Sequence, residues 1–319
     1  MIRFGILGAG NIAHRFAASL AKVEGAELVA ASRRTAGRAA AFLAEVPCTP
    51  GARAYGDHEA LLADPEVDAI YLALPHDLHH AWALRALDAG KAVLCEKPAM
   101  LSEAEAAEVT AAARERGLLF MEAMKTRFVP LHPHVVDAVG ALGPVARVHA
   151  SLCNDALASY RTRDTYILGG GPGSGVLLDC GIYCASWLDE LLPGEIAVER
   201  VDTAFYEGSD VYVDARMTIG GVAAELECAC DRARPRQLVV EGERGVLMVD
   251  DLHRPQNAEL RIAGEQACIL DVPYEVDDFY GQITHFCALM RAGDIESPLM
   301  PHAATCRCAR ILDAIRTTW

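Results

Sequence analysis

The chain has 319 residues, of which 52% are hydrophobic and 23% charged, and its formal net charge is −15. This composition is typical of a globular protein with room for two domains, and it excludes an extended disordered chain. A surface this acidic repels phosphate backbones and anionic lipid, so neither nucleic acid nor membrane is expected as a partner.

Compartment and metal content follow from the same kind of reading. The N-terminus lacks a secretory pattern, and no apolar run approaches the ~20 residues of a membrane span, so we expect a cytoplasmic protein. The chain has 11 cysteines but no C-x-x-C pair and no zinc-ribbon spacing, which argues against a zinc alcohol dehydrogenase. We expect free thiols, mostly in the core, with a redox or metal role as the less favoured alternative.

The first part of the chain alternates short β-rich runs with helical patterns. Strands are predicted at 2–7, 27–32, 69–73, 92–95 and 118–121. Helices are predicted between them at 11–22, 35–45, 57–62, 78–89 and 102–116. This alternation predicts a doubly wound parallel sheet, that is, a Rossmann α/β domain over residues 1–124.

The pattern changes from residue 125. Helices are predicted at 130–139, 176–191, 277–291 and 302–316, and strands at 145–152, 197–206, 211–219, 222–230, 236–241 and 245–249. We therefore predict a C-terminal α+β domain over residues 125–319, with an open, largely antiparallel sheet that carries helices on one face.

A glycine motif directly follows the first predicted strand. Gly8 and Gly10 begin the sequence G-A-G-N-I-A, with Asn11 and Ile12 at the start of the next helix and Ala13 in the third glycine position. In a dinucleotide site the first glycine makes the tight turn and the second lets the backbone approach the pyrophosphate, which lies on the helix N-terminus. The position between a strand and a helix makes this motif a strong prediction of dinucleotide binding.

The end of the second strand distinguishes NADP from NAD. An NAD site places an acidic residue there for the ribose hydroxyls, but this strand ends in Ser32, Arg33 and Arg34. Hydroxyl and guanidinium groups suit a 2′-phosphate, so the sequence favours NADP. The alternative is a basic loop on a solvated surface.

Several longer strings give the chain a resemblance to a known family. They are P-H-D-L-H at 75–79, A-G-K-A-V-L-C-E-K-P at 89–98, M-E-A at 121–123, T-R-F at 126–128 and L-D-C-G-I-Y at 178–183. On these strings the chain resembles the Gfo/Idh/MocA oxidoreductase family over both domains. A tyrosine at 183, where inositol-type members have histidine, is similar to the branch of glucose-fructose oxidoreductase and dimeric dihydrodiol dehydrogenase, whose members use NADP.

The resemblance implies catalytic residues. Oxidation of an alcohol needs a base within hydrogen-bond reach of the hydroxyl proton. A tyrosine with a pKa near ~10 is a poor base unless a cation stabilises its phenolate. We therefore assign Tyr183 as acid/base, Lys97 as the residue that tunes it and binds the reacting oxygen, and Asp179 as a holder of substrate or of Lys97. From the residues alone, a hydrogen-bonded core side chain at Tyr183 and a structural carboxylate at Asp179 would be favoured, and the resemblance reverses this preference.

The resemblance also places a set of residues beside the cofactor. They are Leu74, His76, His79, Glu96, Lys97 and Arg127. It further implies a cis peptide before Pro98. From sequence alone the two histidines are equally compatible with capping or packed residues, and Arg161 and Arg163, two further possible contacts, with solvated surface arginines.

One departure concerns the glycine-rich stretch 169–175, which reads G-G-G-P-G-S-G before Val176 and is longer than the family pattern. It borders the proposed site and leaves the shape of the substrate pocket open. The leading hypothesis is a homo-oligomeric, NADP-dependent dehydrogenase that acts on a small molecule: a sugar, a polyol or a related cyclic alcohol. The alternatives are an NADPH-dependent reductase of a keto-sugar or other carbonyl, and a non-catalytic NADP-binding sensor, which would not need Lys97, Asp179 and Tyr183.

Overall fold

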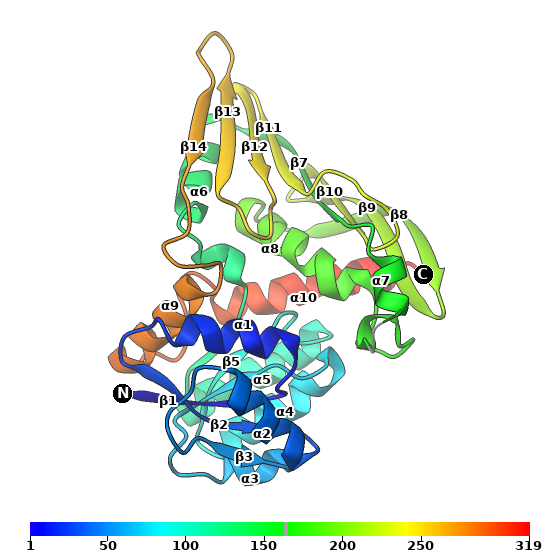
Figure 1. Cartoon of the computed structure of the whole chain (residues 1–319). Helices are drawn as coiled ribbons and strands as arrows, with labels where there is room; N and C mark the ends of the chain where they lie inside the picture. The colour runs from blue at the N-terminus through cyan, green and yellow to red at the C-terminus, as the bar shows by residue number, and fades with distance from the viewer. Residues whose placement is uncertain (163–164) are drawn as a thin grey trace. The chain divides into compact units, whose positions relative to one another are not determined.

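The computed structural model describes residues 1–162 and 165–319, and the chain forms two compact units (Figure 1). The first unit comprises residues 1–100, 104–124 and 275–305, and the second comprises 101–103, 125–274 and 306–319. Arg163, a possible contact in the sequence analysis, lies outside the described residues.

The first unit contains a six-stranded sheet in the order β3-β2-β1-β4-β5-β6, and its neighbouring strands are parallel. The strands are β1 (Ile2–Leu7), β2 (Ala26–Ser32), β3 (Arg53–Tyr55), β4 (Ala69–Leu72), β5 (Ala92–Cys95) and β6 (Phe120–Glu122). The helices are α1 (Asn11–Leu20), α2 (Ala36–Glu45), α3 (His58–Leu62), η1 (His76–Leu78), α4 (His79–Asp88), α5 (Glu103–Arg116) and α9 (Tyr280–Ala292). This strand order is that of a Rossmann fold, which confirms the predicted class.

Helix α9 is where the structure differs from the sequence-based division. Residues 275–305 follow the second unit in the chain but pack with the first, where α9 contacts α1. The Phe286 ring lies 5.8 Å from that of Phe4 on β1, and Phe4 also meets Phe16 on α1. These aromatic contacts make α9 part of the first hydrophobic core, although the sequence analysis placed it in residues 125–319.

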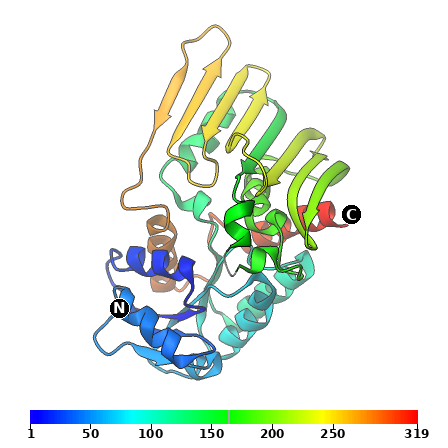
Figure 2. The ribbon, with the colours of Figure 1, turned by 45° about the vertical axis from the view of Figure 1, so that its right-hand side comes forward.

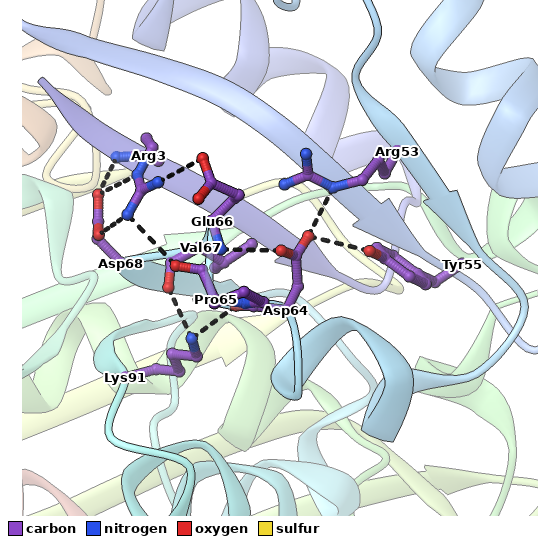
Figure 3. Close-up of polar contacts among 9 residues, drawn as sticks. All are labelled: Arg3, Arg53, Tyr55, Asp64, Pro65, Glu66, Val67, Asp68 and Lys91. Carbon is purple, nitrogen blue, oxygen red and sulfur yellow. Dashed lines mark hydrogen bonds and ion pairs between the residues drawn. The ribbon is translucent and has the colours of Figure 1, made fainter.

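A lysine stabilises the edge of this sheet where the strands begin (Figure 3). The ammonium of Lys91, a residue only 8% exposed just before β5, donates to the carbonyl oxygens of Asp64 at 2.8 Å and Val67 at 2.7 Å. The carboxylate of Asp64 accepts from Arg53 Nε at 2.7 Å and from Tyr55 Oη at 2.9 Å, both on β3. The 64–67 turn is therefore fixed from two sides.

A second ion pair fixes the same turn to β1. Arg3 donates from Nη2 and Nε to the Asp68 carboxylate at 2.7 and 3.0 Å, and from Nη1 to Glu66 at 2.7 Å (Figure 3). Arg3, Asp68 and Lys91 lie at or just before the amino ends of β1, β4 and β5, whereas ligands of such sheets bind at the carboxyl ends. We therefore assign the network to stability.

The second unit contains an eight-stranded sheet in the order β14-β13-β12-β11-β7-β10-β9-β8, whose strands lie side by side in Figure 2. They are β7 (Val145–Cys153), β8 (Ile196–Tyr206), β9 (Ser209–Ile219), β10 (Val222–Ala229), β11 (Gln237–Gly242), β12 (Gly245–Asp250), β13 (Asn257–Ile262) and β14 (Cys268–Asp271). Strands β7 and β10 pair in parallel and the other pairs are antiparallel, so the predicted open, largely antiparallel sheet is confirmed.

Helices cover one face of this sheet (Figure 1). The helical segments of this unit are η2 (Lys125–Phe128), α6 (His132–Ala141), α7 (Leu157–Arg161), η3 (Tyr166–Leu168), the π-helical turn η4 (Leu177–Gly181), α8 (Ile182–Leu191) and α10 (His302–Arg316), which begins in the first unit. Helix α8 packs on β7 and β10, and α6 on β12 and β13. Within the described ranges, no helix is long and apolar enough to span a membrane.

Candidate functional site

The turn between β1 and α1 has the backbone that the glycine motif predicts. Gly8 has φ +91°, and its amide donates to the carbonyl oxygen of Ser32 at 3.2 Å. A Cβ at Gly8 would lie 2.4 Å from the carbonyl oxygen of Ala73, whereas a Cβ at Gly10 would meet no atom within 4 Å. Gly8 is therefore required by the fold itself, while Gly10, the N-cap of α1, borders open space in front of the helix N-terminus. Asn11 is exposed and Ile12 half-buried at the start of α1.

The end of β2 is supported by a histidine that the sequence analysis missed. Ser32 is fully buried, and its hydroxyl lies 2.7 Å from Nδ1 of His58, the first residue of α3. Burial lowers the pKa of His58, and the nearby Arg34 acts in the same direction. Arg33 is half-buried and Arg34 exposed. At this strand end the two arginines are therefore closer to solvent than the fully buried Ser32 hydroxyl.

The loop after β4 is fixed by His79. Its Nε2 lies 2.8 Å from the carbonyl oxygen of Leu74 and its Nδ1 lies 2.9 Å from that of Pro98. Burial lowers the pKa of this fully buried imidazole. His76 is also buried, and its ring lies 5.8 Å from that of His79. His79 thus joins the loop after β4 to the loop after β5.

The segment from Glu96 to Pro98 follows β5, and its Lys97–Pro98 peptide is cis, as the resemblance implies. Lys97 is half-buried, while Glu96 is 8% exposed and its carboxylate accepts from the hydroxyl of Tyr71. Beyond the proline, the amide of Ala99 donates to the buried carboxylate of Glu122 at 2.9 Å. Two acidic side chains therefore support the backbone that carries Lys97.

In the second unit, Asp179 lies in η4 and Tyr183 one turn later in α8. Tyr183 is 7% exposed. Its ring lies 5.5 Å from the imidazole of His253 and 5.8 Å from the ammonium of Lys125. The sequence analysis singled out neither of these basic residues, because they are far from Tyr183 in the chain and match no short motif.

The glycine-rich stretch is fixed where it meets η4. The Asp210 carboxylate accepts from the amide of Leu177 at 2.7 Å. A Cβ on Gly175, which has φ +99°, would lie 1.7 Å from that carboxylate. The amide of Gly170 donates to the Ser209 hydroxyl at 3.0 Å. The additional glycines thus pack against the β8–β9 turn, and Asp210 fixes the start of the turn that carries Asp179.

Arg127 is predicted to contact the cofactor, but the structure buries it within the second unit. Its guanidinium donates from Nη2 to Asp189 at 2.6 Å and from Nε to the Ser186 hydroxyl at 3.0 Å. Its Nη1 lies 2.8 Å from the Glu190 carboxylate. These contacts attach η2 to α8, and the predicted cofactor contact of Arg127 stays a prediction.

The cysteines and the candidate metal ligands of the described residues form no metal centre. All eleven cysteines are free thiols and most are buried. Burial raises the pKa of Cys95, Cys184 and Cys228 well above the ordinary thiol value. Over residues 1–162 and 165–319, no group of three or more His, Cys, Asp or Glu side chains could hold a metal ion.

Known proteins share both parts of this architecture. Residues 2–124 match the oxidoreductase family with an NAD-binding Rossmann fold, GFO_IDH_MocA, and residues 136–248 match the GFO/IDH/MocA C-terminal domain. The chain is 32% identical to the trans-1,2-dihydrobenzene-1,2-diol dehydrogenase of Bos taurus, and 29% identical to the scyllo-inositol 2-dehydrogenase (NADP(+)) of Bacillus subtilis (strain 168). Each alignment covers 99% of this chain and 96% of the relative.

Among solved structures, a 3-ketoreductase from Actinomadura kijaniata in complex with NADP and TDP-benzene superposes with a TM-score of 0.87 at 27% identity, over 99% of this chain and 97% of that one. Structures of the same ketoreductase include variants with a lysine replaced by alanine or glutamate and a tyrosine replaced by phenylalanine. Both family matches agree with the Rossmann strand order and with the E-K-P loop after β5. This chain therefore belongs to the Gfo/Idh/MocA oxidoreductase family.

Proposed function

We propose that this protein is an NADP-dependent oxidoreductase that moves a hydride between the nicotinamide and a CH–OH carbon of a sugar, a polyol or a related cyclic alcohol. The observation that carries the cofactor assignment is the β1–α1 turn, where the space in front of Gly10 and the N-terminus of α1 suit a pyrophosphate. Arg33 and Arg34 follow β2 where an NAD site would place a carboxylate. The named relatives that use or bind NADP support the same choice.

The bound nicotinamide would supply hydride transfer, and the protein would supply positioning and proton transfer. Tyr183 takes the hydroxyl proton of the substrate as phenolate and returns it as phenol in the reverse direction. Lys97 donates a hydrogen bond to the reacting oxygen, where its positive charge stabilises a developing alkoxide. Asp179, one turn before Tyr183, binds a further substrate hydroxyl.

The substrate class rests on the relatives. Dihydrodiol and inositol dehydrogenases oxidise secondary alcohols of six-membered rings, which supports a ring alcohol here. The likeness to a 3-ketoreductase favours a second candidate, reduction of a keto-sugar by NADPH, in which the same residues work in reverse.

Nicotinamide absorbance tests the proposal directly. Purified protein is mixed with NADP or NAD and with aldoses, inositols and cyclic diols, and with NADPH and keto-sugars for the reverse direction. We expect turnover with NADP, its loss in Tyr183→Phe and Lys97→Ala, and its retention in Tyr280→Phe, a matched control on α9. Replacement of Arg33 and Arg34 by alanine should move the preference toward NAD. Tight NADP binding without turnover in either direction would replace the proposal with the sensor alternative, and absence of nucleotide binding would refute it.

A further inference from the structure

Tyr183 is packed among basic side chains of its own unit. Lys125 lies in η2, and His253 follows β12, yet both approach the ring of Tyr183 in α8. Asp251 in turn contacts His253, with 2.6 Å between its Oδ1 and the imidazole Nδ1. Three segments separated by more than fifty residues each thus meet at one aromatic side chain.

Lys125 is a buried cation in contact with this ring. The residue is 4% exposed, and its ammonium lies 5.8 Å from the ring centroid of Tyr183. Lysine is rarely buried to this extent, because removing an ammonium from water is costly. An ammonium in surroundings of low dielectric constant also stabilises a nearby anion more strongly than it would in water. Beside Tyr183, the anion that this charge favours is the phenolate.

His253 contacts the same ring but contributes shape more than charge. Its imidazole meets Tyr183 in an edge-on arrangement, with 62° between the ring planes, and its Nδ1 lies 2.6 Å from Asp251 Oδ1. Burial lowers the pKa of His253 despite the opposing effect of Asp251, and Lys125 lowers it further. The imidazole is therefore neutral near pH 7. Contacts of Asp251 with His253, Arg236 and Arg254 outweigh burial and lower its pKa, so it stays ionised.

The loop that carries His253 is also held in place. The indole Nε1 of Trp187 donates to the carbonyl oxygen of Leu252 at 2.9 Å, and Thr126, next to Lys125, donates to that of His253 at 3.4 Å. The segments that carry Lys125, Tyr183 and His253 are therefore joined to one another by hydrogen bonds. Side chains fixed in this way keep their geometry during a reaction.

We propose that Lys125 is a second cation that tunes Tyr183 for proton transfer, and that His253, fixed by Asp251, holds the Tyr183 ring in its reactive orientation. This inference rests on the proposed function of Tyr183. The charged and titratable groups on this side of the phenol are Lys125, the His253–Asp251 pair and Arg254, with Asp179 on its own turn. Lys125 and His253 act through Tyr183, which makes them positioning residues.

The pH dependence of alcohol oxidation tests the inference for Lys125. The rate depends on the phenolate, so kcat/KM rises with pH until Tyr183 is ionised. We expect Lys125→Met to move this rise up by about one pH unit, with roughly tenfold lower kcat/KM at pH 7. Lys125→Arg, which keeps the charge, should restore most of the shift. Lys91→Met is the matched control, because Lys91 is also buried, at 8% exposed, but donates to carbonyl oxygens in the other unit.

A second readout does not depend on turnover. Titration of tyrosinate absorbance, taken as the difference between each protein and its Tyr183→Phe counterpart, reports the phenol directly. A wild-type pH profile and phenol titration in Lys125→Met would overturn the inference for Lys125, whereas full activity of Tyr183→Phe would instead refute the proposed function. If Lys125→Met does not fold, Lys125→Gln takes its place in both measurements, with the same expected shift.

His253→Phe separates positioning from charge. It keeps an aromatic edge against Tyr183 but removes the bond to Asp251, so we expect a lower kcat with no movement of the pH profile. Asp251→Asn should act in the same direction, because the imidazole loses its ionised partner. A shift of the profile in His253→Phe as large as that in Lys125→Met, or an unchanged kcat in both variants, would overturn the assigned function of His253.

Discussion

The buried ion pairs of Arg127 give the most direct test of whether this residue supports the fold or contacts the cofactor. Arg127 is predicted to contact the cofactor, yet its guanidinium pairs with Asp189 and Glu190 on α8 and is 3% exposed. Arg307 on α10 approaches Asp189 from another side, with 3.1 Å between Nε and Oδ1. The substitution Arg127→Met keeps the length of the side chain and removes its charge. It leaves the Asp189 carboxylate, which is 8% exposed, and the half-buried Glu190 carboxylate, with Arg307 as the remaining described cation beside Asp189.

The expected cost follows from this geometry. Removing one partner of a buried ion pair typically destabilises a protein by about 3–5 kcal/mol, because the other charge stays buried. In a unit of this size, each kcal/mol lowers Tm by roughly 2–4 °C, so we expect a decrease of about 10 °C. Burial already raises the pKa of Asp189 and Glu190 despite Arg127, and the substitution will raise both further. The folded variant then binds protons more tightly than the unfolded chain, so its deficit is largest at neutral pH and shrinks as the pH falls through the raised pKa values.

Thermal unfolding between pH 5 and 8 measures the stability of the variant, and NADP titration of the folded variant measures its affinity for the cofactor. We expect a lower Tm that partly recovers at pH 5 and an unchanged dissociation constant for NADP. Arg216→Met is the control, because Arg216 is 57% exposed and pairs with Glu225 at the surface, where loss of the pair costs less than about 1 kcal/mol. An unchanged Tm with weakened NADP binding would refute the structural assignment and return Arg127 to the cofactor site.

Four further substitutions test the cofactor turn and the stabilising network at the start of the strands. Gly8→Ala places a methyl group 2.4 Å from the carbonyl oxygen of Ala73 at φ +91°, so calorimetry should show a lower Tm as well as weaker NADP binding. At Gly10 a methyl group meets open space, so Gly10→Ala should keep Tm within about 1 °C. It should still weaken the affinity for NADP by at least about tenfold, because the methyl group occupies the space through which the pyrophosphate approaches the backbone. An unchanged affinity would contradict the proposed cofactor site. Lys91→Met leaves two carbonyl oxygens without their donor and should cost about 1–3 kcal/mol in urea unfolding, with normal kcat in the folded fraction, and a lowered kcat would contradict its stabilising function. Burial raises the pKa of Asp64, but its hydrogen bonds lower that pKa below 3.8 overall. The contribution of Asp64 to the free energy of unfolding is therefore present above pH 3.8 and is lost as the pH falls through the lowered pKa. Asp64→Asn should unfold at a lower urea concentration than wild type at pH 7 and match wild type at the lowest pH, and a deficit that persists there would contradict this assignment.

Much of the fold could be predicted from sequence because its signals are local. The buried strands β1, β2, β4 and β5 are apolar runs, and each is followed by a helical pattern. Strand β3 was missed because three residues show no period. Strand β14 was missed because most of its residues are exposed and do not alternate, whereas β13 was missed although N-A-E-L-R-I alternates polar and apolar residues.

The site divides in the same way. Gly8 and Gly10 are recognised from a contiguous motif, and the E-K-P loop from its place after a strand. The contacts that support Ser32 and Tyr183 could not be predicted, because they join positions such as 32 with 58, or 125 and 253 with 183, which only the folded chain brings together. Arg127 belongs to the T-R-F string, but its ion pair inside the second unit could not be predicted either, because Asp189 is far from it in the chain.

The return of α9 to the first unit has a consequence for biosynthesis. The ribosome completes residues 1–124 first, but the surface of Phe4 and Phe16 stays without Phe286 until residues 275–305 emerge. Roughly 150 residues separate these segments, which corresponds to about 8 to 30 seconds of translation at ~5–20 residues per second. The nascent Rossmann unit therefore stays incomplete, with part of its aromatic core uncovered, while the strands of the second sheet are synthesised. A gene fragment that stops at residue 124 would encode the first unit without its last helix. The two units of this chain are therefore not encoded by two continuous segments of the gene.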